Sequence, residues 1–444
     1  MRRPSAPWVV VAIVAFVAAF AGIRAAVATK RPAGDFLRYD RAATLVWRGA
    51  SERLYDNTDL ASGPVWHDPV RFPEKSFRYS PALAVMLAPL GALPPQQGWI
   101  VWSMLCGALV AGGAALSGAL GGRGLPAPSR LRWLPAAVAV LPLLHLYSEN
   151  LKLGQMNCLA FGCSVGSLWA LERRRERLAG LLAAVAVVAK HMPILLILYF
   201  AWRRQWRAAA TGAVVAALLL YALPTALLGP ARHHALLGQW VGQQGHLVTG
   251  SKADRVVDAA GQSLKALLYR WLTPTPYVHL KSDAEDASPG ARGIAVLDAV
   301  DLPPAAVFAL WCASVAAVLM AAARATAPIR GESKEAAAAR LPLEGGLVLA
   351  TMLLVSPESR NPHFQMLALG YAALAGALVA SRWRERGVAL AAALGMVLVL
   401  LSTRGLVGRE GADYLLAWGS IGGGALLVFG ALLVTLRRLR RAVG

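Results

Sequence analysis

The stretch LAGLLAAVAVVAKHMPILLILYFAW, residues 178–202, decides the fold class. It is apolar and long enough to enter a lipid bilayer, which about 20 mostly apolar residues can cross as a helix. Lys190, His191 and Pro193 interrupt it near its centre, where a proline breaks a helix and a charge in lipid is costly. We therefore predict two half-length helices that meet at one face of a membrane, as a broken hairpin.

The whole chain shares this apolar character. Of its 444 residues, 57% are hydrophobic and 16% are charged, whereas an ordinary soluble domain is roughly 45–50% apolar and about 25% charged. This composition excludes a soluble enzyme, and it excludes a disordered chain because disorder needs low hydrophobicity. The four cysteines lie in apolar stretches without a Cys-x-x-Cys pair, which argues against a disulfide framework and a zinc site.

Apolar runs recur along the chain, and we predict an all-α polytopic membrane protein that forms one domain over residues 1–444. The first run follows Arg2 and Arg3, as in a signal peptide, but it is too long for the apolar core of one, so we expect an uncleaved helix. With the two halves of the broken hairpin, about 12 helical membrane segments are expected. The others are residues 8–28, 97–120, 133–149, 156–172, 207–229, 303–324, 342–356, 363–381, 387–402 and 414–436.

The positions of the charged residues predict the orientation of the chain. The net charge is +21, which in a soluble protein would suggest nucleic acid as a partner. With the N-terminus in the cytoplasm, the cytoplasmic segments hold 23 Lys and Arg against 6 acidic residues, and the opposite side holds 21 against 18. Because positive loops stay in the cytoplasm, we predict cytoplasmic N- and C-termini in the cytoplasmic (inner) membrane, and no nucleic-acid partner.

Two long segments then lie on the extracytoplasmic side, residues 29–96 and 230–302. Loops of this length are usually functional when they are structured. In the first, SPALAVMLAPLGALP at 80–94 is apolar but too short to span, so we expect an interfacial helix on the membrane surface. On the cytoplasmic side, GESKEAAAAR at 331–340 is expected to form a short helix or a mobile loop.

Polar residues that could carry chemistry collect on the predicted extracytoplasmic side. Asp35 follows the first span closely, and Tyr39 stands four residues later, so on a helix the two share a face. The elements are separated by up to about 300 residues, yet the predicted topology brings them to one membrane interface, as a membrane enzyme would need. The remaining candidates are Asp40, Gln155 and Asn157 in LGQMN (153–157), Lys190 and His191, Gln262 and Ser263 in GQSLKALLYR (261–270), and Arg360 and His363 in SPESRNPHF (356–364).

Each of these groups also has a plain structural interpretation that the sequence leaves open. Asp35 suits the N-cap of the following helix. Lys190 and His191 suit cations that extend from an apolar stretch to the interface. Gln155 and Asn157 suit hydrogen bonds between helices.

Three further polar pairs also have a plain structural interpretation. Glu358 and Arg360 suit a local ion pair, and His67 with Asp68 suits a polar loop. The neighbouring histidines His233–His234 are not accompanied by a His-Glu-x-x-His motif, so we expect a solvated or interfacial pair rather than a metal site.

The order of these motifs resembles glycosyltransferase family 87, which includes the polyprenyl-phosphate-mannose-dependent α-mannosyltransferases. GDFLRYDRAATLVWRGASERLYD (34–56) followed by FRYSPALAVMLAPLGAL (77–93) is similar to the opening of that family. LGQMN, the hairpin with Lys190, GQSLKALLYR and SPESRNPHF resemble its later elements. Two positions depart from the family pattern: Ser80-Pro81 replaces a double proline, and Gly261 replaces an asparagine.

The resemblance implies a GT-C-type fold, with interfacial helices in a long first outer loop and the active site at the extracytoplasmic face. It implies a polyprenyl-phosphate sugar as donor and a glycolipid or glycan as acceptor, with membrane lipids around the chain. Mannose is the expected sugar, with glucose and arabinose as alternatives from the same enzyme class. A secondary transporter, whose broken helices also carry ionisable residues, and a non-catalytic scaffold are the alternatives from other classes.

The resemblance directly assigns one role, that of the base. It implies that Asp35 is the base that deprotonates the acceptor hydroxyl, with Asp40 as the alternative. Cations at the interface would bind the phosphate of the departing donor lipid, in the order Lys190, His363, Arg360 and His191. The sugar or acceptor would be bound by Tyr39, Gln155, Asn157, Gln262 and Ser263. No compact carboxylate cluster is visible, so neither a metal nor another cofactor is expected.

Overall fold

The computed structural model describes residues 6–27, 34–56, 77–123, 125, 130–249, 259–273, 276–277, 295–296, 299–329 and 331–443. In these ranges the regular structure is almost entirely helical, which confirms the predicted all-α class. The exception is a pair of two-residue antiparallel strands, β1 (Pro276–Tyr277) and β2 (Ala295–Val296), in which Pro276 stands opposite Val296.

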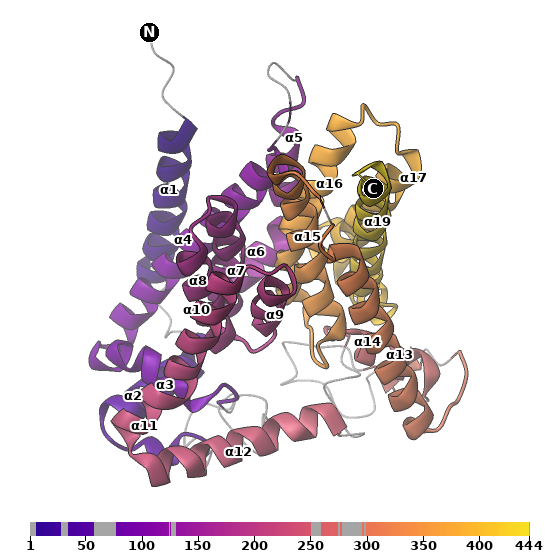
Figure 1. Cartoon of the computed structure of the whole chain (residues 1–444). Helices are drawn as coiled ribbons and strands as arrows, with labels where there is room; N and C mark the ends of the chain where they lie inside the picture. The colour runs from indigo at the N-terminus through magenta and orange to yellow at the C-terminus, as the bar shows by residue number, and fades with distance from the viewer. Residues whose placement is uncertain are drawn as a thin grey trace. The chain divides into compact units, whose positions relative to one another are not determined.

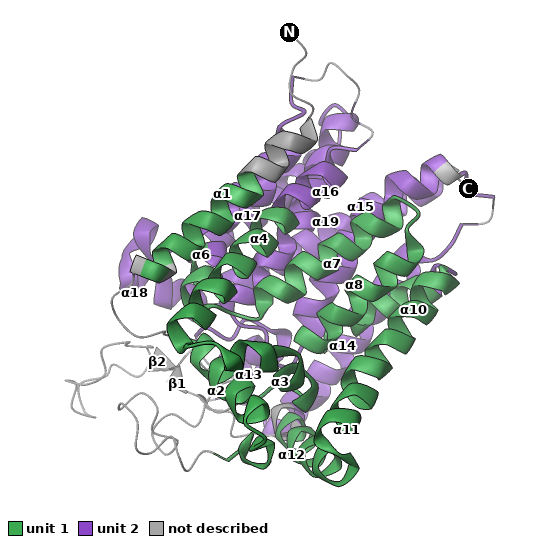
Figure 2. Ribbon diagram, turned by 90° about the vertical axis from the view of Figure 1, so that its left-hand side faces the viewer, with its two compact units in different colours: residues 1–113, 148–201, 205–246 green, residues 114–147, 202–204, 247–444 purple. Residues whose placement is uncertain are grey.

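The chain divides into two compact units, drawn green and purple in Figure 2. Unit 1 comprises Met1–Gly113, Ser148–Ala201 and Gln205–His246. Unit 2 comprises Ala114–Tyr147, Trp202–Arg204 and Leu247–Gly444.

In unit 1, helices α7, α8 and α10 pack side by side (Figure 1). Small residues permit the close approach of α8 and α10, because a Cβ on Gly180 would collide with the Ala208 carbonyl. The helices that lie wholly or mostly in unit 1 are α1 (Ala6–Val27), α2 (Phe36–Trp47), η1 (Ser51–Arg53), α3 (Pro81–Leu87), η5 (Ala88–Ala92), α4 (Pro95–Gly121), α6 (Leu144–Leu153), α7 (Asn157–Glu172), α8 (Glu176–Ala189), α9 (Ile194–Trp202), α10 (Trp206–Ala217), the π-helix η7 (Leu218–Ala222), α11 (Leu223–Leu228) and α12 (Pro230–Thr249).

In unit 2, α15 packs against both α16 and α19, and α17 packs against α19. Again small residues set the separation of the helices: a Cβ on Gly346 of α15 would lie 2.8 Å from the Gly370 Cα of α16. The elements of this unit, besides the two strands, are α5 (Leu134–Val140), η6 (Leu141–Leu143), α13 (Leu264–Leu272), α14 (Pro304–Thr326), α15 (Lys334–Val355), η8 (Asn361–Met366), α16 (Leu367–Ala380), α17 (Arg386–Leu400), α18 (Arg404–Ala417) and α19 (Ser420–Val443).

Several of these helices can cross a membrane, so the chain is a multi-pass membrane protein. In the part of the chain that the structure describes, six helices are long and apolar enough, and the bent pair α17–α18, with an angle of 89° between its halves, could make a seventh. Apart from the unbroken 22-residue α1, the other predicted segments are shorter or broken helices, and the predicted total of about 12 remains a prediction. The six are Pro95–Gly121, Trp206–Leu228, Pro304–Thr326, Glu335–Val355, Asn361–Ala380 and Ser420–Arg441.

The break predicted in residues 178–202 is confirmed. Helix α8 ends at Ala189 and α9 begins at Ile194, so Lys190, His191 and Pro193 lie in the connection between them. The backbone of Lys190 is extended, with φ −152° and ψ 135°, because the residue leaves the helix there.

The predicted start of one span was wrong. Helix α15 begins at Lys334, not at 342, and it continues through Pro342, so the residues from 334 to 340 are part of it and form neither a separate short helix nor a loop. Arg340 and Glu344 both lie inside this helix, where an unpaired charge would be costly. The structure removes that cost by pairing them: their side chains are 2.6 Å apart and almost fully buried.

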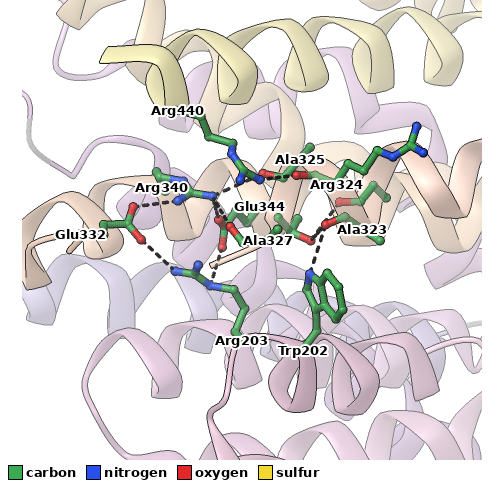
Figure 3. Close-up of polar contacts among 12 residues, drawn as sticks. Trp202, Arg203, Ala323, Arg324, Ala325, Ala327, Glu332, Arg340, Glu344 and Arg440 are labelled. Carbon is green, nitrogen blue, oxygen red and sulfur yellow. Dashed lines mark hydrogen bonds and ion pairs between the residues drawn. The ribbon is translucent and has the colours of Figure 1, made fainter. Parts of the chain in front are cut away.

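These two residues belong to a closed ring of four ion pairs in unit 2 (Figure 3). Arg340 lies 2.7 Å from Glu332, and Glu332 lies 3.6 Å from Arg203. Arg203 returns to Glu344 at 3.2 Å, and none of the four side chains is more than 11% exposed. Each charge therefore has opposite charges on both sides, as buried ionic groups require.

The last span also starts later than predicted. The expected segment 414–436 is divided at Gly419, whose φ of +85° is a left-handed conformation that suits glycine. Residues before it form α18, and the final helix α19 begins at Ser420.

The long outer segments contain more helical structure than the sequence indicated. Residues 230–302 include the 20-residue helix α12 and the shorter α13. The helix predicted within 80–94 is present as α3 and η5, and its residues Ala82, Leu83 and Ala84 are fully buried within the protein. Its position at the membrane surface remains a prediction.

Candidate functional site

Three of the quoted motifs meet in unit 1 around the hydroxyl group of Tyr39. That hydroxyl lies 2.9 Å from the hydroxyl of Tyr79, and it accepts a hydrogen bond of 3.2 Å from the backbone N–H of Met156. The Tyr39 ring is completely buried and stands edge-on to Trp102, whose Nε1 donates to the Gly154 carbonyl at 2.7 Å. Segments 34–40, 77–81 and 153–157 are thus joined at one residue.

Asp35 occupies the N-cap position of α2, but its side chain makes no capping hydrogen bond. Its carboxylate lies 3.0 Å from the guanidinium of Arg38, and 19% of the side chain remains exposed. The backbone of Asp35 donates to the Leu153 carbonyl at 2.9 Å. Gly34 precedes it with φ +71°, where a Cβ would lie 2.9 Å from Leu153, so glycine is needed for this close approach.

Asp40 lies on the same helix in a different environment. Burial raises the pKa of its carboxyl group above the usual value. Its Oδ1 atom is buried and has no hydrogen-bond partner among the residues that the structure describes. A carboxyl group in this environment favours its protonated form more than an exposed one does.

Gln155 and Asn157 form a local hydrogen-bonded cluster at the start of α7. The Asn157 amide donates to the Asn150 side chain at 3.0 Å and also to the Gln155 side chain. Asn157 is fully buried, whereas Gln155 is half-buried. The hydrogen-bonding role expected of these residues is therefore present.

Lys190 and His191 lie at the same end of the packed helices α7 and α8 as the cluster formed by Gln155 and Asn157. Helices α7 and α8 pack together and are joined by only three residues, 173–175, so they run in opposite directions. The beginning of α7, at Asn157, and the end of α8, before Lys190, are therefore both remote from that turn. Lys190 is half-buried and His191 is exposed.

In unit 2, the segment around Gln262 is bound to the segment 356–363. Gly261 and Arg360 form an antiparallel β-bridge, and the Gln262 N–H donates to the Ser359 carbonyl at 2.7 Å. The Ser263 hydroxyl donates to the Pro357 carbonyl at 3.0 Å and accepts from the N–H of Ala266, which caps α13. Two motifs about 90 residues apart therefore form one backbone structure.

Arg360 and His363 close the turn that begins η8. The Arg360 N–H donates to His363 Nδ1 at 2.6 Å, and the His363 N–H donates to the Arg360 carbonyl at 2.9 Å. The Arg360 side chain is 3.9 Å from Glu358, so the expected local ion pair is present, although it is long.

The sequence reading missed the third segment of this cluster, the junction between α18 and α19. Gln262 donates to the Leu416 carbonyl at 2.7 Å and accepts from the Gly422 N–H at 3.1 Å. The fully buried Arg270 donates to the Ala417 carbonyl at 2.9 Å. The signal was the glycine-rich GSIGGG at 419–424, because a Cβ on Gly422 would lie 2.7 Å from the Gln262 carbonyl.

The predicted site residues thus form two groups, one in each unit. Unit 1 holds Asp35, Tyr39, Asp40, Gln155, Asn157, Lys190 and His191, and unit 2 holds Gln262, Ser263, Arg360 and His363. His67 and Asp68 lie outside the described residues.

Histidines and acidic residues do not gather as metal ligands in the described ranges, where no group of three or more could hold an ion. The pair His233–His234 at the start of α12 is instead hydrogen-bonded to neutral groups. His233 Nδ1 lies 2.8 Å from the Thr225 hydroxyl, and His234 Nε2 lies 2.7 Å from the Tyr221 hydroxyl.

Comparison with known proteins assigns the family. The family model for glycosyltransferase family 87 matches residues 77–357, which is more than half of the chain. No curated protein and no solved structure matches the chain. The match includes Tyr79, the 153–157 motif, Lys190 and Gln262, while Asp35 lies before it and Arg360 lies after it. The chain therefore belongs to glycosyltransferase family 87 and is a membrane glycosyltransferase.

Proposed function

We propose that this enzyme transfers a sugar, mannose, from a polyprenyl phosphate to a hydroxyl group of a glycolipid or glycan at the extracytoplasmic face of the cytoplasmic membrane. The observation that carries the proposal is the meeting of segments 34–40, 77–81 and 153–157 around Tyr39, which places Asp35 beside two other family-like motifs. Family membership supports an enzyme rather than the transporter or scaffold considered above.

Asp35 is the proposed base. Its carboxylate is partly exposed, so an acceptor hydroxyl could reach it, and its backbone is fixed by the bond to Leu153. In an inverting transfer this carboxylate takes the proton of the acceptor hydroxyl while that oxygen attacks the anomeric carbon. Asp40 suits the role less well, because its Oδ1 atom is buried, where an acceptor hydroxyl cannot reach it.

Cationic and hydrogen-bonding groups would stabilise the departing polyprenyl phosphate. Lys190 is first among them because it lies half-buried at the helix break, at the same end of α7 and α8 as the Asp35 cluster. His363 is second. Its Nδ1 accepts the Arg360 N–H, so the neutral ring carries its proton on Nε2, which can donate to a phosphate oxygen. Arg360 and His191 follow.

The proposed sugar-binding residues divide by burial. Gln155 is half-buried and is the proposed direct ligand of a sugar hydroxyl. Tyr39, Asn157, Gln262 and Ser263 are buried and hydrogen-bonded within their own units, so we propose that each fixes the motif to which it belongs.

A donor panel tests the proposed substrate class. Membranes that contain the enzyme would be given radiolabelled mannose, glucose or arabinose, each on polyprenyl phosphate, and separately a nucleotide sugar. We expect transfer from the mannose lipid and none from the nucleotide sugar, in assays with and without EDTA. Transfer from the nucleotide sugar alone would contradict the proposed donor class, and a loss of transfer in EDTA that Mg²⁺ restores would contradict the expected metal independence.

A further inference from the structure

The residue that most directly shapes the Asp35 environment is Arg38, to which neither the sequence reading nor the family match assigns a role. Asp35 has helical backbone angles, φ −75° and ψ −20°, rather than the extended angles typical of an N-cap. Its side chain makes no bond to the amides of the first turn. The carboxylate instead meets the residue three positions later, which is within reach on a helix.

Hydrogen bonds hold the chain on both sides of Arg38. On one side, the Asp35 backbone is bound to Leu153 at 2.9 Å. On the other side, Tyr39 follows Arg38 directly, and its buried hydroxyl is held by Tyr79 and Met156. With both flanking positions fixed, the 3.0 Å contact between Arg38 and Asp35 has a defined geometry.

The partial exposure of this pair leaves it accessible to a ligand. The Arg38 side chain is 14% exposed and that of Asp35 is 19% exposed. These values contrast with Arg340 and Glu344, at 2% and 0%, whose charges are closed off from ligands. Within the described ranges, the Asp35 carboxylate forms its ion pair with Arg38.

We propose that Arg38 is the positioning residue of the base: it holds the Asp35 carboxylate toward the acceptor and offsets its charge, so that an anionic donor phosphate can approach. The inference rests on the proposed role of Asp35. A guanidinium provides several N–H donors in a rigid plane, so it can hold one carboxylate oxygen while the other accepts the proton of the acceptor hydroxyl. Without Arg38, the carboxylate would be less fixed and would repel the donor phosphate.

The test compares Arg38→Gln, Arg38→Lys and Asp35→Asn in full-length enzyme, with Arg48→Gln as the matched control. Arg48 is exposed at the other end of the same helix. We expect Arg38→Gln to lower kcat by about 10- to 100-fold, the usual cost of a misplaced catalytic group, and to raise the KM for the donor lipid. We expect Arg38→Lys to recover part of the rate, Arg48→Gln to behave as wild type, and all four proteins to keep the wild-type unfolding temperature in detergent.

Different failures point to different conclusions. Wild-type kinetics in Arg38→Gln, together with an inactive Asp35→Asn, would overturn the role of Arg38 and leave the base in place. A full rate in Asp35→Asn would overturn the proposed base, and the inference with it. A fall in unfolding temperature that accounts for the lost rate of Arg38→Gln, with no recovery in Arg38→Lys, would make Arg38 a structural residue and also overturn the inference.

Discussion

At the residue scale, Tyr39 is as central to the candidate site as Asp35. Tyr39 lies at the point where three motifs meet. Its hydroxyl is hydrogen-bonded to the Tyr79 hydroxyl and also accepts a hydrogen bond from the Met156 N–H. The spacing of four residues correctly indicated that Asp35 and Tyr39 belong to the same helical region. It could not indicate the partners of Tyr39, because those lie 40 and 117 residues away along the chain.

Replacing Tyr39 by phenylalanine tests this meeting point. The change keeps the ring against Trp102 but leaves a buried N–H without its acceptor, which costs about 1–3 kcal/mol. We expect a loss of that size in the free energy of unfolding, measured in detergent, and a lower transfer rate. Tyr414→Phe, at an exposed tyrosine, is the control. Equal stability of the two variants would contradict the role given to the Tyr39 hydroxyl.

Asp40 gives a prediction about pH. Burial raises the pKa of its carboxyl in the folded state, so the protonated form is favoured there. The stability that this provides is fully present below the unfolded-state pKa and is lost as the pH rises through the folded-state pKa. Asp40→Asn should therefore be more stable than wild type near neutral pH, with the difference shrinking as the medium becomes acidic.

Thermal unfolding of both proteins at several pH values between about 4 and 7.5 would measure this difference, since an ordinary aspartate titrates near 3.9. A difference that does not change with pH would contradict the burial of Asp40. An inactive Asp40→Asn that remains folded would move the proposed base from Asp35 to Asp40.

At the element scale, α15 shows that a run of apolar residues predicts a helix but not where the helix begins. The run from 342 to 356 correctly predicted a helix, because its composition alone favours one in a membrane. Its true start at Lys334 was hidden, because the ion-pair ring that permits charges in the segment includes Arg203, which is far away in sequence. Helix boundaries set by long-range pairing cannot be read from local composition.

The ring predicts a large and specific loss of stability. Glu344→Gln should lower the free energy of unfolding by about 3–5 kcal/mol, because it leaves the buried Arg340 and Arg203 without one of their charge partners. The double variant Arg203→Gln/Glu344→Gln should lose less than the sum of the two single variants. Glu410→Gln, on an exposed residue of α18, should change little. Additive losses would contradict a coupled ring.

At the scale of the whole molecule, the predicted sidedness of the membrane remains to be tested. In unit 1, the 14-residue α8 separates the arginine turn 173–175 from Lys190 and His191 by about 21 Å. The positive-inside rule assigns the turn to the cytoplasm and the helix break to the opposite face.

Cysteine labelling in a cysteine-free background would measure this sidedness. His191→Cys, at an exposed position, should react with a membrane-impermeant thiol reagent applied to intact cells. Arg174→Cys, exposed at the other end of the same helix, should react only after the membrane is opened. The reverse pattern would contradict the proposed extracytoplasmic active site.

What the sequence indicates about the candidate site has limits, and these limits have a physical cause. The order of the motifs identified the family. It also indicated the candidate site segments, residues 34–40, 153–157, 261–270 and 356–364. The contribution of Leu416 and Gly422 was missed because backbone carbonyl and N–H groups carry it, and these have no residue-specific signal. Only the glycines that make room for the contact are visible in the sequence.

The most direct test of the central claim is sugar transfer by Asp35→Asn. Membranes with equal amounts of folded wild-type or variant enzyme would receive radiolabelled polyprenyl-phosphate mannose, and the label would be followed into the acceptor fraction. We predict transfer by the wild type and a rate at least about 100-fold lower in the variant, since general base catalysis contributes about 10²–10⁴-fold. Equal transfer by the two proteins would contradict the assignment of Asp35 as the base.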